Sequence, residues 1–157
     1  MENKINLNEL LEIYNMELDD VKNLYNKSEG VVILISQEDI KAVEDGKKVE
    51  DFDEWKEEII LNALDYKSNK DKYIEFPRRE DFDEYFIMEK FIQNCNDENL
   101  KAELNLNISG EDAFRAFKSA LYRLDLIDQW YNFKDKEFLK FLAQWCNKNE
   151  IEYILEI

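Results

Sequence analysis

Apolar residues follow helical spacing at the start of the chain and then the pattern of two strands. Residues 7–14 carry apolar side chains at i, i+3, i+4 and i+7, and Asn6 stands at the N-cap position of the helix they predict. Residues 21–26 and 31–35 read as strands, joined by a four-residue loop that ends in Gly30. We therefore expect a short helix followed by a β-hairpin.

The remainder of the chain is predominantly of helical pattern. Helices are predicted over residues 36–44, 54–66, 81–94, 97–106, 109–123, 125–131 and 136–148. Ser36 and Asp81 stand at N-cap positions, and residues 67–72 read as a polar loop. Residues 73–76 precede Pro77 and so predict an edge strand, and residues 150–156 a closing strand.

These elements predict an α+β fold that is predominantly helical, with a small N-terminal antiparallel β-hairpin or sheet. Three glycines and one proline supply little turn material for an all-β sandwich. We expect a single compact domain over residues 1–157, with 1–76 as an acidic α+β lobe and 77–157 as a helical lobe.

Acidic residues dominate the charge of the chain. Lys and Arg number 21 and Asp and Glu number 37, which gives a net charge of −16. This charge argues against direct nucleic-acid binding, which requires cations to neutralise phosphates. An acidic surface attracts a basic protein partner or imitates a nucleic acid, although solubility alone also explains such a composition. Residues 1–76 hold 20 of the acids and 10 of the bases.

The residue types that most enzymes need near neutral pH are scarce. Histidine is absent, and no Gly-rich phosphate loop, nucleophile elbow or Cys–His pair occurs. Cys95 and Cys146 fit no metal-binding or redox spacing and read as buried thiols. We therefore expect a non-catalytic protein with no cofactor and no metal site. No signal-peptide pattern or membrane-spanning run occurs, which predicts a cytoplasmic protein without a membrane partner.

An acidic run over residues 50–58 is the first candidate site. Its candidate partner-binding residues are Asp51, Asp53, Glu54, Glu57 and Glu58. The same run also suits a solvated helix start, where negative charge complements the helix dipole. Carboxylates bind divalent cations too, but the run lacks the alternating, glycine-containing spacing of an EF-hand loop.

A basic stripe forms the second candidate site. Arg115 and Lys118 share one face of a predicted helix with Ser119 and Tyr122. Together with Arg78 and Arg79, these cations predict a site for phosphate or carboxylate groups, because arginine offers a bidentate fork to either. The alternative is that they pair with the protein's own carboxylates.

An aromatic cluster over residues 130–133 is the third candidate. Trp130 and Tyr131 lie in the segment predicted to connect the last two helices. Aromatic residues at this density form a ligand platform or anchor a protein partner. They equally well fill the junction between two helices, since Trp and Phe are mostly core residues.

Several motifs resemble those of one known family. They are Leu24-Tyr25-Asn26 before Gly30-Val31-Val32, Tyr73-Ile74 before Phe76-Pro77, and the segments 85–91, 113–118, 130–135 and 145–146. In their order they resemble the bacterial uncharacterised protein family 0158 over almost the whole chain. The resemblance implies a shared fold and leaves function open.

Two functional hypotheses follow from the sequence. The first is an acidic cytosolic binding domain that engages a basic protein partner, in its sharper form as a nucleic-acid-mimicking inhibitor. The second is binding or processing of a small anionic ligand, such as phosphate or a nucleotide, at Arg78, Arg79, Arg115 and Lys118.

Overall fold

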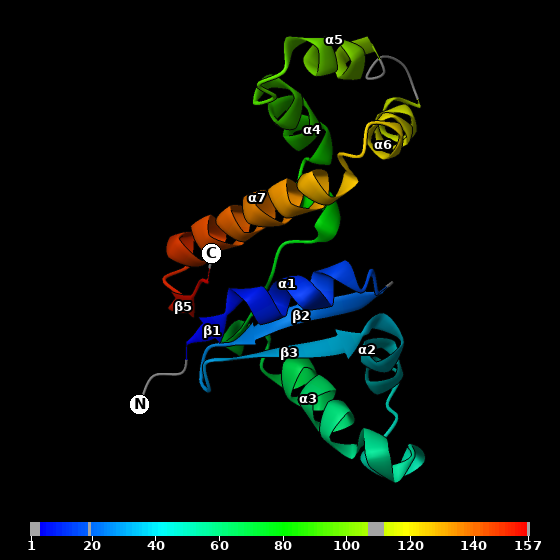
Figure 1. The fold of residues 1–157 in the computed structure, drawn as a ribbon. Helices are drawn as coiled ribbons and strands as arrows, with labels where there is room; N and C mark the ends of the chain where they lie inside the picture. Colours follow the sequence, from blue (N-terminus) through cyan, green and yellow to red (C-terminus); the bar gives the residue numbers. More distant parts are fainter. Residues whose placement is uncertain (1–3, 19, 107–111, 157) are drawn as a thin grey trace. The chain divides into compact units, whose positions relative to one another are not determined.

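The computed structural model describes residues 4–18, 20–106 and 112–156, which group into two compact units. Unit 1 contains the described residues up to Arg78 and residues 143–156. Unit 2 contains the described residues of 79–142. The last helix, α7 (Ile127–Lys148), supplies residues to both units (Figure 1).

Unit 1 is built around a three-stranded antiparallel sheet with the strand order β3-β2-β4. Its strands are β1 (Ile5–Asn6), β2 (Val21–Asn26), β3 (Val31–Ser36), β4 (Tyr73–Glu75) and β5 (Tyr153–Ile154). Its helices are α1 (Leu7–Asn15), α2 (Gln37–Glu44) and α3 (Glu57–Ser68), with short 3-10 turns η1 (Val49–Asp51), η2 (Glu54–Lys56) and η3 (Lys70–Lys72). The predicted hairpin and the edge strand before Pro77 are both present.

Asn26 determines where the hairpin turns. Its buried side-chain oxygen accepts hydrogen bonds from the backbone N–H groups of Ser28, at 3.0 Å, and Glu29, at 3.3 Å. Gly30 follows with a φ of 69°, a conformation that is accessible to glycine without a Cβ penalty. The asparagine thus acts as a local turn template, a common role of its short amide side chain.

Helices α2 and α3 bury an aliphatic core against this sheet (Figure 1). The buried residues are Leu24, Ile35, Ile40, Val43, Ile60, Ala63 and Tyr73. Ser36 caps α2 as predicted, because its hydroxyl accepts a 3.1 Å hydrogen bond from the N–H of Asp39. Strand β3 is an edge strand and mostly half-buried, although residues 31–35 are all apolar.

The two ends of the described chain meet in unit 1. Strands β1 and β5 pair in parallel, with Ile5 opposite Tyr153. The Asn8 side chain donates to the carbonyl of Glu156 at 2.8 Å and accepts from its N–H at 2.9 Å. These hydrogen bonds give the backbone after β5 partners from the start of α1.

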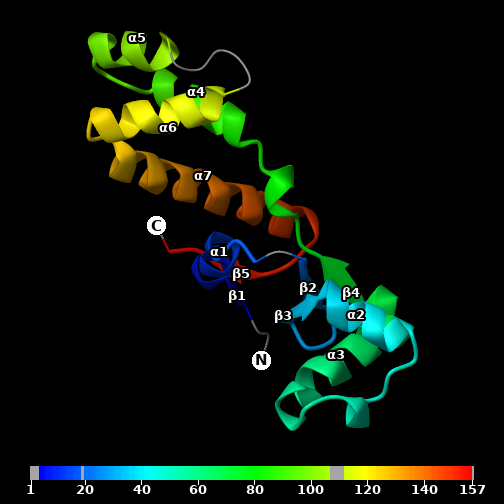
Figure 2. The ribbon, with the colours of Figure 1, turned by 90° about the vertical axis from the view of Figure 1, so that its right-hand side faces the viewer.

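Unit 2 is helical and its core contains a cluster of aromatic rings. It contains a 3-10 turn, η4 (Arg79–Asp81), the helices α4 (Glu84–Gln93), α5 (Glu98–Leu106) and α6 (Ala113–Arg123), and the first part of α7. Helix α6 lies alongside α7 (Figure 2), where the Phe117 and Trp130 rings meet edge to face with centroids 5.0 Å apart. Phe91 contacts both rings and also Phe133.

Two boundary predictions are corrected by the structure. The last two predicted helical pieces form one continuous helix, α7, because no glycine or proline interrupts residues 126–148 and the aromatic residues bury one side of the helix. The N-cap of α4 is Asp83 and not Asp81, since the Asp83 carboxylate accepts from the N–H of Phe86 at 3.1 Å. The predicted helix start over residues 109–111 lies outside the described residues.

The observed architecture confirms the predicted fold class, α+β and mainly helical with a small antiparallel sheet. In the part of the chain that the structure describes, every helix is too short or too polar to cross a membrane.

Candidate functional sites

The first candidate is a group of exposed carboxylates in unit 1, which we call the acidic surface: Asp51, Asp53, Glu54, Glu57 and Glu58. Four of them lie on η1, η2 and the first turn of α3, Asp53 lies between η1 and η2, and all five are exposed. None of them forms an ion pair with a described residue. Asp51 accepts a hydrogen bond from the backbone N–H of Lys48 at 2.8 Å, which holds the 3-10 turn.

An exposed tryptophan stands inside the acidic surface. The Trp55 side chain lies between Glu54 and Glu57 in sequence and is 70 % exposed. The ammonium of the neighbouring Lys56 pairs with the buried Asp39 at 3.0 Å. Its ammonium also lies 5.6 Å from the Trp55 ring centroid, so Lys56 joins the segment to α2 without neutralising the acidic surface.

Asp65 is the centre of a polar cluster at the end of α3. It accepts hydrogen bonds from the Tyr73 phenol, from Lys72 at 2.9 Å and from Asn69 at 2.9 Å. These bonds, with that of Tyr73 the strongest, lower the pKa of Asp65 from 3.8 to about 2. Burial and the same hydrogen bond raise the pKa of Tyr73 above its ordinary value.

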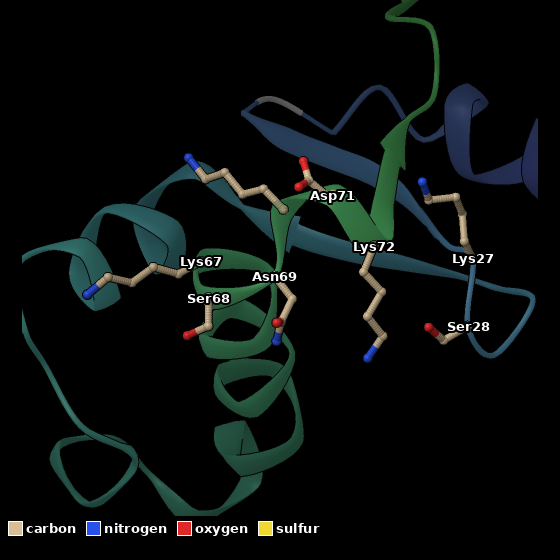
Figure 3. Close-up of a pocket in the computed structure, with 8 residues that line it drawn as sticks. Lys27, Ser28, Lys67, Ser68, Asn69, Asp71 and Lys72 are labelled. Carbon is tan, nitrogen blue, oxygen red and sulfur yellow. The ribbon is translucent and has the colours of Figure 1, made fainter.

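Lysines line a cavity of about 750 Å³ beside this cluster. Figure 3 shows Lys72 and Asn69 extending into the space between the end of α3 and the β2–β3 turn that carries Ser28. Several of these lysines are already engaged. Lys72 pairs with Asp65, Lys67 donates to the Val43 carbonyl at 3.0 Å, and Lys70 stacks on the Tyr66 ring. Of these three lysines, only Lys72 is neutralised by a carboxylate of a described residue.

A second group of cations lies in unit 2, on helices α6 and α7. The Lys118 ammonium lies 5.8 Å from the ring centroids of both Phe114 and Tyr131. The Lys134 ammonium lies 5.3 Å from the same Tyr131 ring. A hydrogen bond with the Tyr131 phenol raises the pKa of Tyr122. The Tyr131 ring is thus shared by two lysines, an attractive arrangement for each cation.

Lys134 is the most unusual residue of this group. Its side chain is 9 % exposed, and it has no carboxylate among the described residues at ion-pair distance. Burial lowers its pKa, Glu84 opposes this change, and the positive charges of Arg79 and Lys118 lower the pKa further. A buried ammonium is costly unless it is paired, so its position requires an explanation.

The sequence did not indicate Lys134, although a signal for it exists. Lys134 lies four residues after Trp130 and four residues before Phe138, and both of these side chains are buried. The position therefore falls on the buried stripe of α7, which becomes visible only when residues 127–148 are taken as one helix.

The predicted basic residues fall into both units. Arg78 belongs to unit 1, where its guanidinium is 3.6 Å from Glu75. Arg79 belongs to unit 2 and pairs with Glu84 at 3.4 Å. Lys118 shares the Tyr131 ring with Lys134, and the positive charge of Arg79 lowers the pKa of Lys134. Arg115 is exposed and forms no ion pair with a described residue.

The two predicted aromatic residues have different environments. Trp130 has no exposed surface and is enclosed by Phe91, Phe114 and Phe117, so in the folded unit it is inaccessible to a partner. Its indole N–H is buried without a hydrogen-bond acceptor in the described structure. Tyr131 is 37 % exposed and is available at the surface.

Comparison with known proteins gives one match. A model of Uncharacterised protein family (UPF0158) matches residues 3–157. The chain belongs to this family. No curated protein and no solved structure matches it. Within residues 4–18, 20–106 and 112–156, no three Cys, Asp or Glu side chains gather closely enough to hold a metal ion.

Proposed function

We propose that this member of the UPF0158 family is a non-catalytic cytoplasmic binding protein whose acidic surface engages a basic protein partner. The observation that carries the proposal is the 70 % exposure of Trp55 among five carboxylates that no described cation neutralises. Elsewhere in unit 1, described carboxylates such as Asp39, Asp65 and Glu75 have lysine partners at 3.6 Å or less. The acidic surface differs because its charge is directed to solvent.

The chemistry of this surface specifies the kind of partner. Carboxylates steer a segment rich in Lys and Arg to the surface and fix its orientation. Trp55 offers a flat aromatic face to an apolar side chain or to an arginine. Leu61, in α3 and 49 % exposed, is a further exposed apolar side chain of unit 1. In the sharper form of the proposal, the basic segment is one that otherwise binds nucleic acid.

Affinity capture of a protein partner, with the wild-type chain and defined variants as bait, tests the proposal. The acidic variant carries Asp51→Asn, Asp53→Asn, Glu57→Gln and Glu58→Gln. We expect it to lose the captured partner, and Trp55→Ser to weaken capture without a loss of folding. Wild-type capture should also weaken as salt rises, because the attraction is between exposed charges.

A matched control separates the surface from the net charge. In this control variant, the exposed residues Glu12, Glu44, Asp45 and Glu152 are replaced by Gln or Asn. These changes remove the same amount of charge from other parts of unit 1. We expect this control to retain the partner. Equal capture by the acidic variant and the wild type would refute the proposal, and release of the partner by added duplex DNA would favour its nucleic-acid-mimicking form.

A further inference from the structure

The buried lysine of unit 2 indicates a second site, independent of the acidic surface. Removing an ammonium from water is unfavourable by several kcal/mol unless an opposite charge replaces the lost hydration. The residues around Lys134 supply too little opposite charge to replace the lost hydration. Arg79 and Lys118 add two further positive charges, against the carboxylates of Glu84 and Asp135. Glu84 is itself paired with Arg79 at 3.4 Å.

An aromatic ring also stabilises the Lys134 ammonium. Tyr131 lies 5.3 Å from the Lys134 ammonium and 5.8 Å from that of Lys118. A ring stabilises a partly desolvated cation by less than the cost of burying the charge. Both ammonium groups lie within 5.8 Å of this one ring centroid and repel each other, so an anion that contacts both is favoured.

We propose that Lys134 and Lys118 form a binding site for a phosphate group, either inorganic phosphate or a phosphomonoester. Two ammonium groups from α6 and α7 suit a tetrahedral group with several acceptor oxygens better than a carboxylate with two. A phosphomonoester carries nearly two negative charges at neutral pH, enough to compensate both ammonium groups.

The surroundings also provide access and a place for an organic substituent. Lys118 is half-buried, and the phenols of Tyr131 and Tyr122 are 37 % and 64 % exposed. Phe114 and Tyr131 flank Lys118 with apolar ring surface. A phosphomonoester would place its phosphate on the lysines and its organic part against these rings, with the phenols as hydrogen-bond donors.

Thermal unfolding and calorimetric titration of the full chain with inorganic phosphate test this site, at constant ionic strength. We expect phosphate to raise the wild-type Tm, as any ligand of the folded state does. Lys134→Met keeps the apolar stem and removes the charge. Without phosphate its Tm should be at or above the wild-type value, and its response to phosphate should be lost.

Two further variants keep the test decisive if Lys134→Met does not fold. Lys118→Gln should raise the phosphate dissociation constant about tenfold, the effect of losing one charge-assisted contact. Lys136→Gln, an exposed change on the same helix, should leave it unchanged. Acetate should give no shift in Tm. Comparing the dissociation constants of phosphoserine and inorganic phosphate shows whether an organic substituent improves binding.

Several results would overturn the assignment. One is the absence of any wild-type response to phosphate and to phosphoserine. Another is an equal response in the wild type and Lys118→Gln. A response abolished by Lys70→Gln but retained in Lys118→Gln would place the anion in the lysine-lined cavity of unit 1. A lower Tm for folded Lys134→Met without phosphate would show that the ammonium is already satisfied by the protein.

Discussion

The two units bury their apolar residues and compensate their charges in different ways. Unit 1 packs aliphatic side chains against a sheet, whereas unit 2 combines aliphatic residues such as Leu104 and Leu121 with edge-to-face aromatic rings around Trp130. Counted over the sequence, unit 1 holds 23 acidic and 12 basic residues and unit 2 holds 14 and 9. The more acidic unit nevertheless contains the lysine-lined cavity, so net charge is a poor guide to local charge.

The two units also differ in whether their lysines are paired with carboxylates. In unit 1, Lys22, Lys56 and Lys72 each meet a carboxylate within 3.6 Å. In unit 2, Lys134 is buried without such a partner among the described residues. Proteins satisfy buried charges far more consistently than exposed ones, so the exception in unit 2 is more informative than the many carboxylates of unit 1.

The largest expected effect concerns the two tryptophans, one from each unit. Trp130→Ala removes a fully buried indole from the core of unit 2 and should lower the free energy of unfolding by about 3–5 kcal/mol. Trp55→Ala in unit 1 should change it by less than about 0.5 kcal/mol, since that side chain is 70 % exposed. Urea unfolding followed by circular dichroism measures both. Similar losses for the two variants would contradict the assigned burial.

Local sequence signals account for much of the fold. The Asn6 and Ser36 caps and the Asn26 turn act within three residues, so the sequence alone could place α1, α2 and the hairpin. Parallel pairing of β1 with β5 was not predicted, because it joins residues about as far apart in sequence as the chain permits and no local rule selects the partner.

The candidate sites were predictable to different degrees. Exposure of the acidic surface follows from the cost of burying carboxylates, so its position could be read from the sequence. The grouping of Lys118 with Lys134 could not, because it depends on α6 lying beside α7 (Figure 2). Arg78 and Arg79 are adjacent in sequence, yet they belong to different units and pair with different glutamates.

A smaller effect is expected at Glu137, the best-paired carboxylate of unit 2. Its side chain is 10 % exposed and accepts from Lys90 at 3.0 Å and from Lys140 at 3.4 Å. Burial alone would raise the pKa of Glu137, but the two lysines outweigh it and lower the pKa. Glu137→Gln should therefore cost about 1–2 kcal/mol at neutral pH, an amount limited by the exposure of both lysines.

The pH dependence and a control sharpen this prediction. Because the folded-state pKa is lowered, the stabilisation is present above the ordinary carboxyl pKa and is lost as pH falls through the folded-state value. The difference between Glu137→Gln and the wild type should thus shrink on acidification. Glu80→Gln, an exposed change in the same unit, should show no such trend in urea unfolding at several pH values.

The smallest expected effect concerns Asp65 in unit 1, whose carboxylate is 35 % exposed. Its folded-state pKa of about 2 lies below the ordinary 3.8, so its contribution is complete above about pH 4 and is lost as pH falls towards 2. Asp65→Asn should lower stability at neutral pH by less than about 1 kcal/mol, because solvent screens the exposed part of the pair with Lys72.

Asp65→Asn should also lose less stability than the wild type between pH 4 and pH 2, whereas Asp71→Asn, at an exposed neighbour, should follow the wild type. Parallel acid-unfolding curves for wild type and Asp65→Asn would mean that Tyr73 and Lys72 do not hold this carboxylate in its charged form.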